Sequence, residues 1–232
     1  MSSAATGPGG ATSWRRPGDV AEAYASEPWT TRAHTMVRWA TSPMAAVERE
    51  LPERGDVLEI GCGHGMFSLT AALGSSDRHV VGADIDGAKL VEARRAADAA
   101  GLGTDRLEFS EVEPAWRPPV EVLYDAVVIL DVLYLLGLRG ALDLTRAAAR
   151  VVRPGGRLLV KEMDTELRWK ARFCAAQEFA ATRLTHVTEG STVELVPLDA
   201  LRSVMEDEGL QVGVRRLDRH LPWPHALLVG TR

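Results

Sequence analysis

The segment VLEIGCGHGMF, residues 57–67, places three glycines at alternate positions directly after an apolar run. Gly61, Gly63 and Gly65 let the backbone turn tightly and approach a ligand where a Cβ atom would clash. Their spacing differs from the G-x-G-x-x-G of dinucleotide-binding loops, because a methionine stands where the third glycine would fall. The pattern predicts a ligand-binding loop, with a role in the turn alone as the alternative.

An acidic residue closes the next apolar run. VVGADID, residues 80–86, places Asp84 about twenty residues past the glycine loop, the spacing at which a carboxylate accepts hydrogen bonds from both hydroxyls of a ribose. Asp84 could instead cap the following helix, but Asp86 lies nearer to the start of that helix and suits the N-cap better. We therefore expect Asp84 to bind a nucleoside.

Strands and helices alternate from residue 56 onward. Strand-like runs lie at 56–61, 79–85, 106–110, 124–130 and 156–162, and alanine-rich helical stretches at 66–73, 88–100 and 141–152. This alternation predicts βαβ units and a parallel sheet with right-handed crossovers. A helix over 197–209 and the strands LQVGVRRLD and HALLVGT follow. The expected fold is α/β: a Rossmann-like, doubly wound, mostly parallel seven-stranded sheet with an antiparallel C-terminal edge hairpin.

The remaining segments predict the domain organisation. Residues 1–18 are small, polar and glycine-rich, which is typical of a disordered tail. Residues 19–232 are expected to form a single domain. Within it, residues 19–50 form an N-terminal helical cover and residues 165–195 an inserted helical segment. The RPGG at 153–156 predicts a turn between a helix and a strand.

Composition excludes several classes of protein. A net charge of -5 over 232 residues offers no basic field for nucleic acid. The two cysteines lie far apart and predict neither a disulfide framework nor a zinc site, so we expect no metal and a reducing cytoplasm. No apolar run reaches the length of a bilayer span. We expect a cytoplasmic protein with no integral membrane segment, and a homodimer is left open.

These motifs, in this order, resemble those of the class I S-adenosylmethionine-dependent methyltransferases. VLEIGCGHG is similar to the first motif of that family, VVGADID to the second, and YDAVVILDVLY with RPGGRLLV to its later strand motifs. The resemblance covers about residues 56–160. It implies a methyltransferase with S-adenosylmethionine as its cofactor.

The resemblance also implies roles for particular residues. Asp84 would hold the ribose, Ile85 would pack on the adenine, and Glu113 would contact the adenine amino group, where the family more often has aspartate. Trp116 either covers the adenine or packs in the core. The other residues implied at the cofactor, mostly around its methionine portion, are Glu59, Gly61, Cys62, Gly63, Gly65 and Leu130.

The charges at the strand ends agree with such a cofactor, which carries a sulfonium cation and a zwitterionic amino acid end. Glu59, Asp84, Glu113 and Asp131 supply negative potential and hydrogen-bond acceptors. The arginine or lysine cluster that a pyrophosphate requires is missing from these motifs.

Methyl transfer needs mainly alignment of the reacting atoms, and a general base only where the acceptor must lose a proton. The candidate catalytic residues are Asp131 and Tyr134, after the fourth strand, and His34 in the cover. Asp131 could equally be structural, and Glu162 offers a similar carboxylate after the fifth strand. His225, in the terminal hairpin, is expected to be structural.

The leading hypothesis is a small-molecule methyltransferase that modifies an oxygen, nitrogen or carbon of a secondary metabolite or lipid-like acceptor. Aromatic and basic residues of the cover, among them Arg38 and Trp39, could form an acceptor pocket with a cationic mouth, or could only pack and be solvated. Two alternatives stay open. One is a nicotinamide-dependent oxidoreductase, which Met66 in the glycine loop disfavours, and the other is a non-catalytic protein that binds S-adenosylmethionine.

Overall fold

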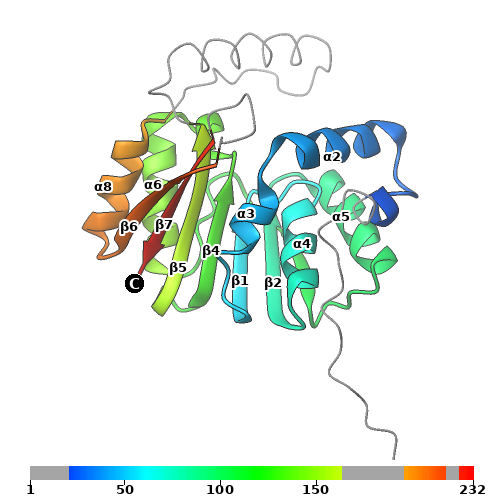
Figure 1. Ribbon diagram of the computed structural model, residues 1–232, viewed down its shortest axis with the longest axis horizontal. Helices are drawn as coiled ribbons and strands as arrows, with labels where there is room; N and C mark the ends of the chain where they lie inside the picture. Colours follow the sequence, from blue (N-terminus) through cyan, green and yellow to red (C-terminus); the bar gives the residue numbers. More distant parts are fainter. Residues whose placement is uncertain (1–20, 164–195, 218–224) are drawn as a thin grey trace, which may run out of the picture.

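A computed structural model describes residues 21–163, 196–217 and 225–232, which form a seven-stranded sheet covered by helices (Figure 1). The strands lie in the order β3-β2-β1-β4-β5-β7-β6. Their bounds are β1 Arg54–Ile60, β2 Asp77–Asp84, β3 Leu107–Glu111, β4 Tyr124–Leu130, β5 Val152–Met163, β6 Gln211–Arg216 and β7 His225–Thr231.

Strand direction confirms the expected sheet. Neighbouring strands from β3 to β5 pair in parallel, whereas β7 runs antiparallel to both β5 and β6. The chain order reverses between β1 and β4, which creates a crevice at their carboxyl ends where open α/β sheets bind ligands. The loops after β1, β2 and β4 therefore meet at one end of the sheet.

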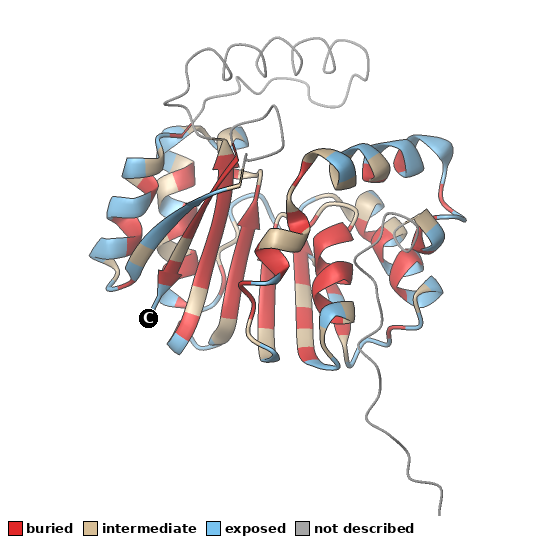
Figure 2. Ribbon diagram, in the orientation of Figure 1, coloured by how far each residue is buried: buried red, intermediate tan, exposed pale blue. Residues whose placement is uncertain are grey.

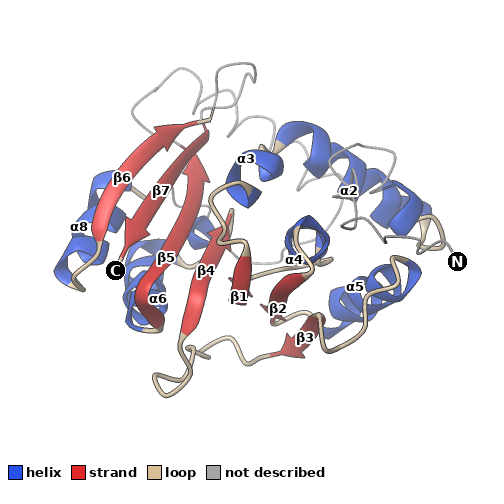
Figure 3. Ribbon diagram, turned by 60° about the horizontal axis from the view of Figure 1, so that its bottom comes forward, coloured by secondary structure: helices blue, strands red, loops and turns tan. Residues whose placement is uncertain are grey.

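Helices cover both faces of the sheet. Their bounds are α2 Trp29–Thr41, α3 Met44–Glu48, α4 Met66–Gly74, α5 Gly87–Ala99, α6 Gly137–Arg150 and α8 Leu198–Asp207, with a 3-10 turn, η1, at Leu133–Leu135. One core cluster joins the sheet to α3, α4 and α5, and a second joins it to α6 and α8 (Figure 3). Because both faces are covered, the central strands are mostly buried toward their carboxyl ends and rich in apolar residues (Figure 2).

Neighbouring strand residues serve opposite cores. Val57 packs in the cluster beneath α4, and the next residue, Leu58, packs in the cluster beneath α6. The alternation follows from the two-residue period of a strand. It also fixes which face each polar residue at the strand ends occupies.

The structure corrects two expected boundaries. β5 begins at Val152, before the RPGG that was expected to precede it, because Tyr124 already pairs with Val152 and the register then shifts so that Ala126 pairs with Arg157. Gly155 takes a left-handed φ of 80° inside this irregularity. α6 begins at residue 137 and not at 141. The predicted tail at 1–18 and inserted segment at 165–195 lie outside the described residues.

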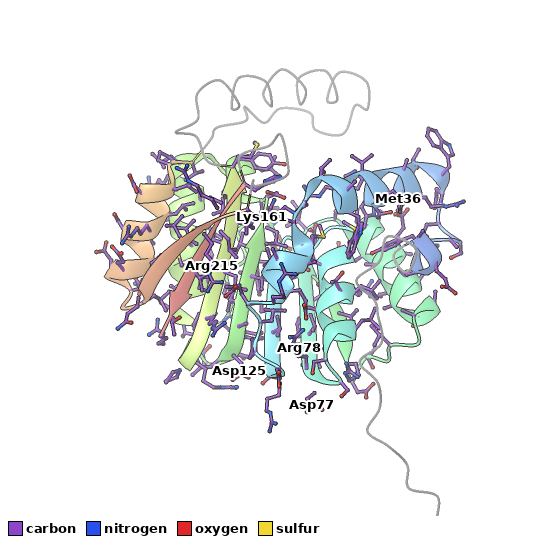
Figure 4. The ribbon with its side chains drawn as sticks, viewed as in Figure 1. Met36, Asp77, Arg78, Asp125, Lys161 and Arg215 are labelled. Carbon is purple, nitrogen blue, oxygen red and sulfur yellow. The ribbon has the colours of Figure 1, made fainter. Side chains whose placement is uncertain are left out.

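The amino end of the sheet is held by ion pairs. The guanidinium of Arg78 is buried and its Nη1 lies 2.8 Å from Oε1 of Glu48. Oδ2 of Asp125 accepts from the backbone N–H of Asp56 at 2.8 Å and from Nη1 of Arg153 at 2.5 Å. Figure 4 shows Arg78 and Asp125 at the opposite end of the sheet from Lys161. These ion pairs stabilise the amino end of the sheet, and the candidate site lies at its carboxyl end.

Candidate active site

The three glycines adopt backbone conformations that other residues rarely take. The φ angles of Gly61, Gly63 and Gly65 are 78°, 53° and 74°. A Cβ on Gly61 would lie 2.3 Å from a methyl group of Val132, so the side chain after β4 packs directly on the loop. A Cβ on Gly63 would meet nothing within 4 Å. Gly61 is therefore required for packing, whereas Gly63 borders open space.

The carboxylate of Asp84 fixes the glycine loop from the end of β2. Its Oδ2 accepts from the N–H of Gly63 at 2.7 Å, and its Oδ1 accepts from the N–H of Asp86 at 2.9 Å. Because each carboxylate oxygen has two lone pairs, both can still accept from a ligand hydroxyl. Asp86 is the N-cap of α5 and accepts from the N–H groups of Ala88 and Lys89.

An apolar surface follows Asp84. The side chain of Ile85 is 60% exposed, although it comes directly after a buried strand. The N–H of Val112 donates to the carbonyl of Asp84 at 3.0 Å, which brings the turn after β3, with Glu113 exposed in it, to the same edge. Trp116 is half-buried against the core cluster on the α6 face.

Three other residues implied at the cofactor are buried: Glu59, Cys62 and Leu130. The hydroxyl of Ser68 donates to Oε2 of Glu59, and burial raises the pKa of Glu59 to about 8. Burial likewise raises the pKa of the Cys62 thiol. Leu130 belongs to the core cluster beneath α4. A direct contact of these three with a ligand stays a prediction.

The N-terminal cover binds the glycine loop from outside. The hydroxyl of Tyr24 donates to the carbonyl of His64 at 2.6 Å. Oε2 of Glu92 accepts from the Thr31 hydroxyl at 2.9 Å and lies 2.9 Å from Nδ1 of His64. The ring of His34 lies 5.2 Å from that of His64. The cover therefore places His34 beside the glycine loop. Tyr24 was among the aromatic residues expected to form an acceptor pocket and instead binds this loop, and the sequence offered no signal for Glu92.

A second group of polar residues lies where β4 and β5 end. Asp131 has a φ of 54°, a left-handed conformation that is uncommon outside glycine. Nζ of the fully buried Lys161 lies 2.6 Å from both of its carboxylate oxygens. Nη2 of Arg38, from α2, lies 3.1 Å from Oδ2 of Asp131. We call these three residues the Asp131 cluster.

The charges of the Asp131 cluster make its carboxylate a poor general base. Burial alone would raise the pKa of Asp131, but the ammonium of Lys161 and the guanidinium of Arg38 hold that pKa below its ordinary value. The predicted proton-accepting role of Asp131 therefore loses physical support. The alternative prediction, a structural acid, fits these contacts.

Glu162 lies beside the cluster on the next residue of β5. Its Oε1 accepts from the N–H of Leu133 at 2.9 Å and so holds η1, which carries the half-buried Tyr134. Burial, together with the charge of Asp131, raises the pKa of Glu162 to about 8. Glu162 can therefore exchange a proton near neutral pH, which Asp131 cannot.

His225 begins β7, opposite Met163 at the end of β5. Its Nε2 lies 3.0 Å from the carbonyl oxygen of Thr41. Because a carbonyl only accepts, Nε2 carries the hydrogen and Nδ1 is left with a lone pair. Burial and the nearby charge of Lys161 lower the pKa of His225 to about 4, which keeps the ring neutral. Within the described part of the chain this buried Nδ1 has no hydrogen-bond donor.

Comparison with known proteins agrees with this site. The methyltransferase domain family matches residues 57–156. The chain is 32% identical over 130 residues to a demethylmenaquinone methyltransferase of Clavibacter sepedonicus, over 55% of this chain and 48% of that one. It is 29% identical over 185 residues to a 27-O-demethylrifamycin SV methyltransferase of Amycolatopsis mediterranei, over 79% of this chain and 64% of that one. The chain thus spans between about half and two thirds of the length of these relatives.

Solved structures share the fold. An O-methyltransferase family protein from Burkholderia thailandensis has a TM-score of 0.67 and 26% identity, over 90% of this chain and 61% of that one. The magnesium protoporphyrin IX methyltransferase of Synechocystis PCC 6803, solved with bound SAH, has a TM-score of 0.63 and 18% identity, over 87% of each chain. Residues 57–156 are thus similar to the methyltransferase domain family, and the sheet order is shared with these solved structures.

Proposed function

We propose that this chain is an S-adenosylmethionine-dependent methyltransferase that acts on an oxygen, nitrogen or carbon of a small-molecule acceptor. The open space at Gly63 carries this proposal. The backbone there is left-handed, its N–H is held by Asp84, and among the described residues no atom beyond Gly63 and its two chain neighbours lies within 4 Å of the place of a Cβ. A nucleoside fits beside such a bare backbone, with its ribose on the free lone pairs of Asp84 and its base on Ile85.

The charges of the site favour S-adenosylmethionine over a dinucleotide. A pyrophosphate is bound by free cations or by helix N-termini with free N–H groups. Lys89, in the first turn of α5, is not a free cation, because its Nζ lies 3.1 Å from a carboxylate oxygen of Asp86, although α4, the helix after the glycine loop, has no side-chain cap. Met66, at the position that a dinucleotide loop gives to glycine, is buried in the core. These features weigh against the nicotinamide-dependent oxidoreductase.

The named relatives support a small-molecule acceptor. Two of them carry names that refer to menaquinone and to a rifamycin, which are small molecules and not proteins or nucleic acids. The acceptor of this chain is therefore proposed to be a metabolite of comparable size. We further propose that η1, Glu162 and His225 border its binding site.

The chemistry requires placement more than acid–base catalysis. When bound, the cofactor supplies an electrophilic methyl group on its sulfonium. Alignment of an acceptor by the chain can contribute about 7–11 kcal/mol in well-oriented systems. If the acceptor must lose a proton, the carboxylate of Glu162 is a stronger base than that of Asp131, whereas the low pKa of His225 suits its Nδ1 to accepting a hydrogen bond and not to taking a proton. Tyr134 and His34 stay predictions.

Calorimetric titration with S-adenosylhomocysteine and, separately, with NADH tests the proposal. We expect saturable binding of S-adenosylhomocysteine, no binding of NADH, and weaker binding of S-adenosylhomocysteine to Asp84→Ala. A folded wild-type protein that does not bind S-adenosylhomocysteine contradicts the proposal. Turnover of S-adenosylmethionine with a panel of hydroxyl-, amine- and enol-bearing acceptors then separates an enzyme from a binding protein.

A further inference from the structure

Arg38 is a cation with unused hydrogen-bonding capacity at the ligand-binding end of the sheet. It lies in the last turn of α2, and its side chain is 33% exposed. A guanidinium has five N–H donors in a fixed planar arrangement. The described part of the chain gives it one ionic contact, from Nη2 to Oδ2 of Asp131.

Among the described residues, the charge of Arg38 is left without a carboxylate of its own, because Asp131 is paired with Lys161 and the raised pKa of Glu162, about 8, favours its neutral form. Lys161 is fully buried, and its Nζ lies 2.6 Å from both oxygens of Asp131, so this pair is already neutral. Arg38 then adds a net positive charge to the Asp131 cluster. Lys161 cannot bind an incoming anion itself because it has no exposed surface. An anion at this place would therefore meet the guanidinium of Arg38.

The position of Arg38 relative to the glycine loop indicates which anion this is. Asp131, which Arg38 contacts, is followed by Val132, and the side chain of Val132 packs on Gly61. One turn before Arg38, His34 lies against His64 of the same loop. Arg38 thus lies between the glycine loop and the end of β4, away from the Asp84 end of the loop, where the ribose is proposed to bind.

We propose that Arg38 binds the α-carboxylate of the amino acid portion of the cofactor. A guanidinium can donate two parallel hydrogen bonds to a carboxylate, which is the strongest and most specific way for a side chain to bind that group. The bond would also neutralise the charge left over in the Asp131 cluster. This inference rests on the proposed function, because it names the part of the same ligand that Arg38 recognises.

The test compares two ligands that differ only in the carboxylate. S-adenosylhomocysteine and its decarboxylated analogue, S-adenosyl-3-thiopropylamine, are titrated calorimetrically into the wild type, Arg38→Met and Arg32→Met. Arg32→Met is the matched control, because Arg32 is an exposed arginine of the same helix without a contact to Asp131. Arg38→Met removes one partner of Asp131 but leaves the Lys161–Asp131 pair in place, so the buried carboxylate keeps a cation beside it.

We expect the wild type and Arg32→Met to bind S-adenosylhomocysteine about 10–100-fold more tightly than the analogue, the range for a hydrogen bond to a charged group. Arg38→Met should lose this preference by weakening the binding of S-adenosylhomocysteine alone. Arg38→Lys, which keeps the charge without the planar donors, should retain a smaller preference. Arg38→Lys also replaces Arg38→Met as the test variant if Arg38→Met does not fold.

Two results overturn the inference. Arg38→Met that keeps the full preference would assign the carboxylate to another group, and a wild type that binds both ligands equally would show that no residue recognises it. Either result leaves the proposed function standing, because S-adenosylhomocysteine still binds. A folded wild type that binds neither ligand contradicts the proposed function itself, and with it this inference.

Discussion

The two halves of the ligand-binding edge are built in different ways. At the ends of β1 and β2, the half that we propose for the cofactor (the cofactor half) consists of a left-handed backbone loop fixed by Asp84, a residue 21 positions from the amide that it holds. At the ends of β4 and β5 and the start of β7, the half that we propose for the acceptor (the acceptor half) consists of buried side chains from distant segments. Lys161 meets Asp131, and His225 meets a carbonyl 184 residues away. The first half therefore depends on local conformation, and the second on paired charges.

The largest effect on stability is expected for a substitution in the glycine loop of the cofactor half. Gly61→Val should lower the free energy of unfolding by about 4 kcal/mol, since a left-handed φ costs about 1–2 kcal/mol and the clash with Val132 about 1–3 kcal/mol. Gly63→Ala should cost only about 1–2 kcal/mol, because its Cβ meets nothing, yet it should weaken binding of S-adenosylhomocysteine. Denaturant unfolding and calorimetry measure both. A Gly63→Ala variant with wild-type affinity would contradict the assignment of the open space to the cofactor.

Removal of Lys161, one partner of the buried ion pair with Asp131, should show that the acceptor half depends on paired charges. Lys161→Met leaves the buried carboxylate of Asp131 with Arg38 alone, and we expect a loss of about 3 kcal/mol, the lower end for breaking a buried ion pair. Lys89→Met, which breaks an exposed pair with Asp86, should change stability by less than about 1 kcal/mol. Urea unfolding compares the two variants. Equal losses of stability in the two variants would mean that the buried ion pair contributes no more than the exposed one.

Substitution of neighbouring aspartates should separate ligand binding from helix capping. Asp84→Asn should weaken binding of S-adenosylhomocysteine about tenfold or more, because an amide offers the ribose and the loop fewer acceptors. Asp86→Ala should lower stability by about 1 kcal/mol through loss of the N-cap of α5 and leave affinity nearly unchanged. Affinities that respond in the reverse order would exclude Asp84 as the ribose ligand.

The last comparison concerns pH. Burial raises the pKa of Glu162 to about 8 in the folded protein, above its unfolded value of about 4.3. The folded state therefore favours the protonated carboxyl, and its contribution to stability is complete below pH 4.3 and is lost as pH rises to about 8. Glu162→Gln should reduce this decline, while Glu121→Gln, at an exposed position, should not. The free energy of unfolding measured across pH 4–9 gives the slope of stability against pH. Identical slopes for the two variants would refute the raised pKa of Glu162.

The sequence predicted the cofactor half far better than the acceptor half. The helix after the glycine loop was predicted to begin at residue 66, where α4 begins, and the capping role of Asp86 followed from its position before a helix. Such features are local, so spacing reveals them. The buried Lys161 appeared only as a lysine in an apolar strand, with no sign of its partner 30 residues earlier. The free Nδ1 of His225 depends on a contact with Thr41 that no local pattern encodes.

A crystal structure with bound S-adenosylhomocysteine tests the division of the edge most directly. We expect the ribose hydroxyls on Asp84, the nucleoside beside Gly63, and the α-carboxylate on the guanidinium of Arg38. The region next to Glu162 and His225 should stay open to an acceptor. A ligand bound elsewhere, or one whose adenosine lies in the acceptor half, would contradict the proposed site.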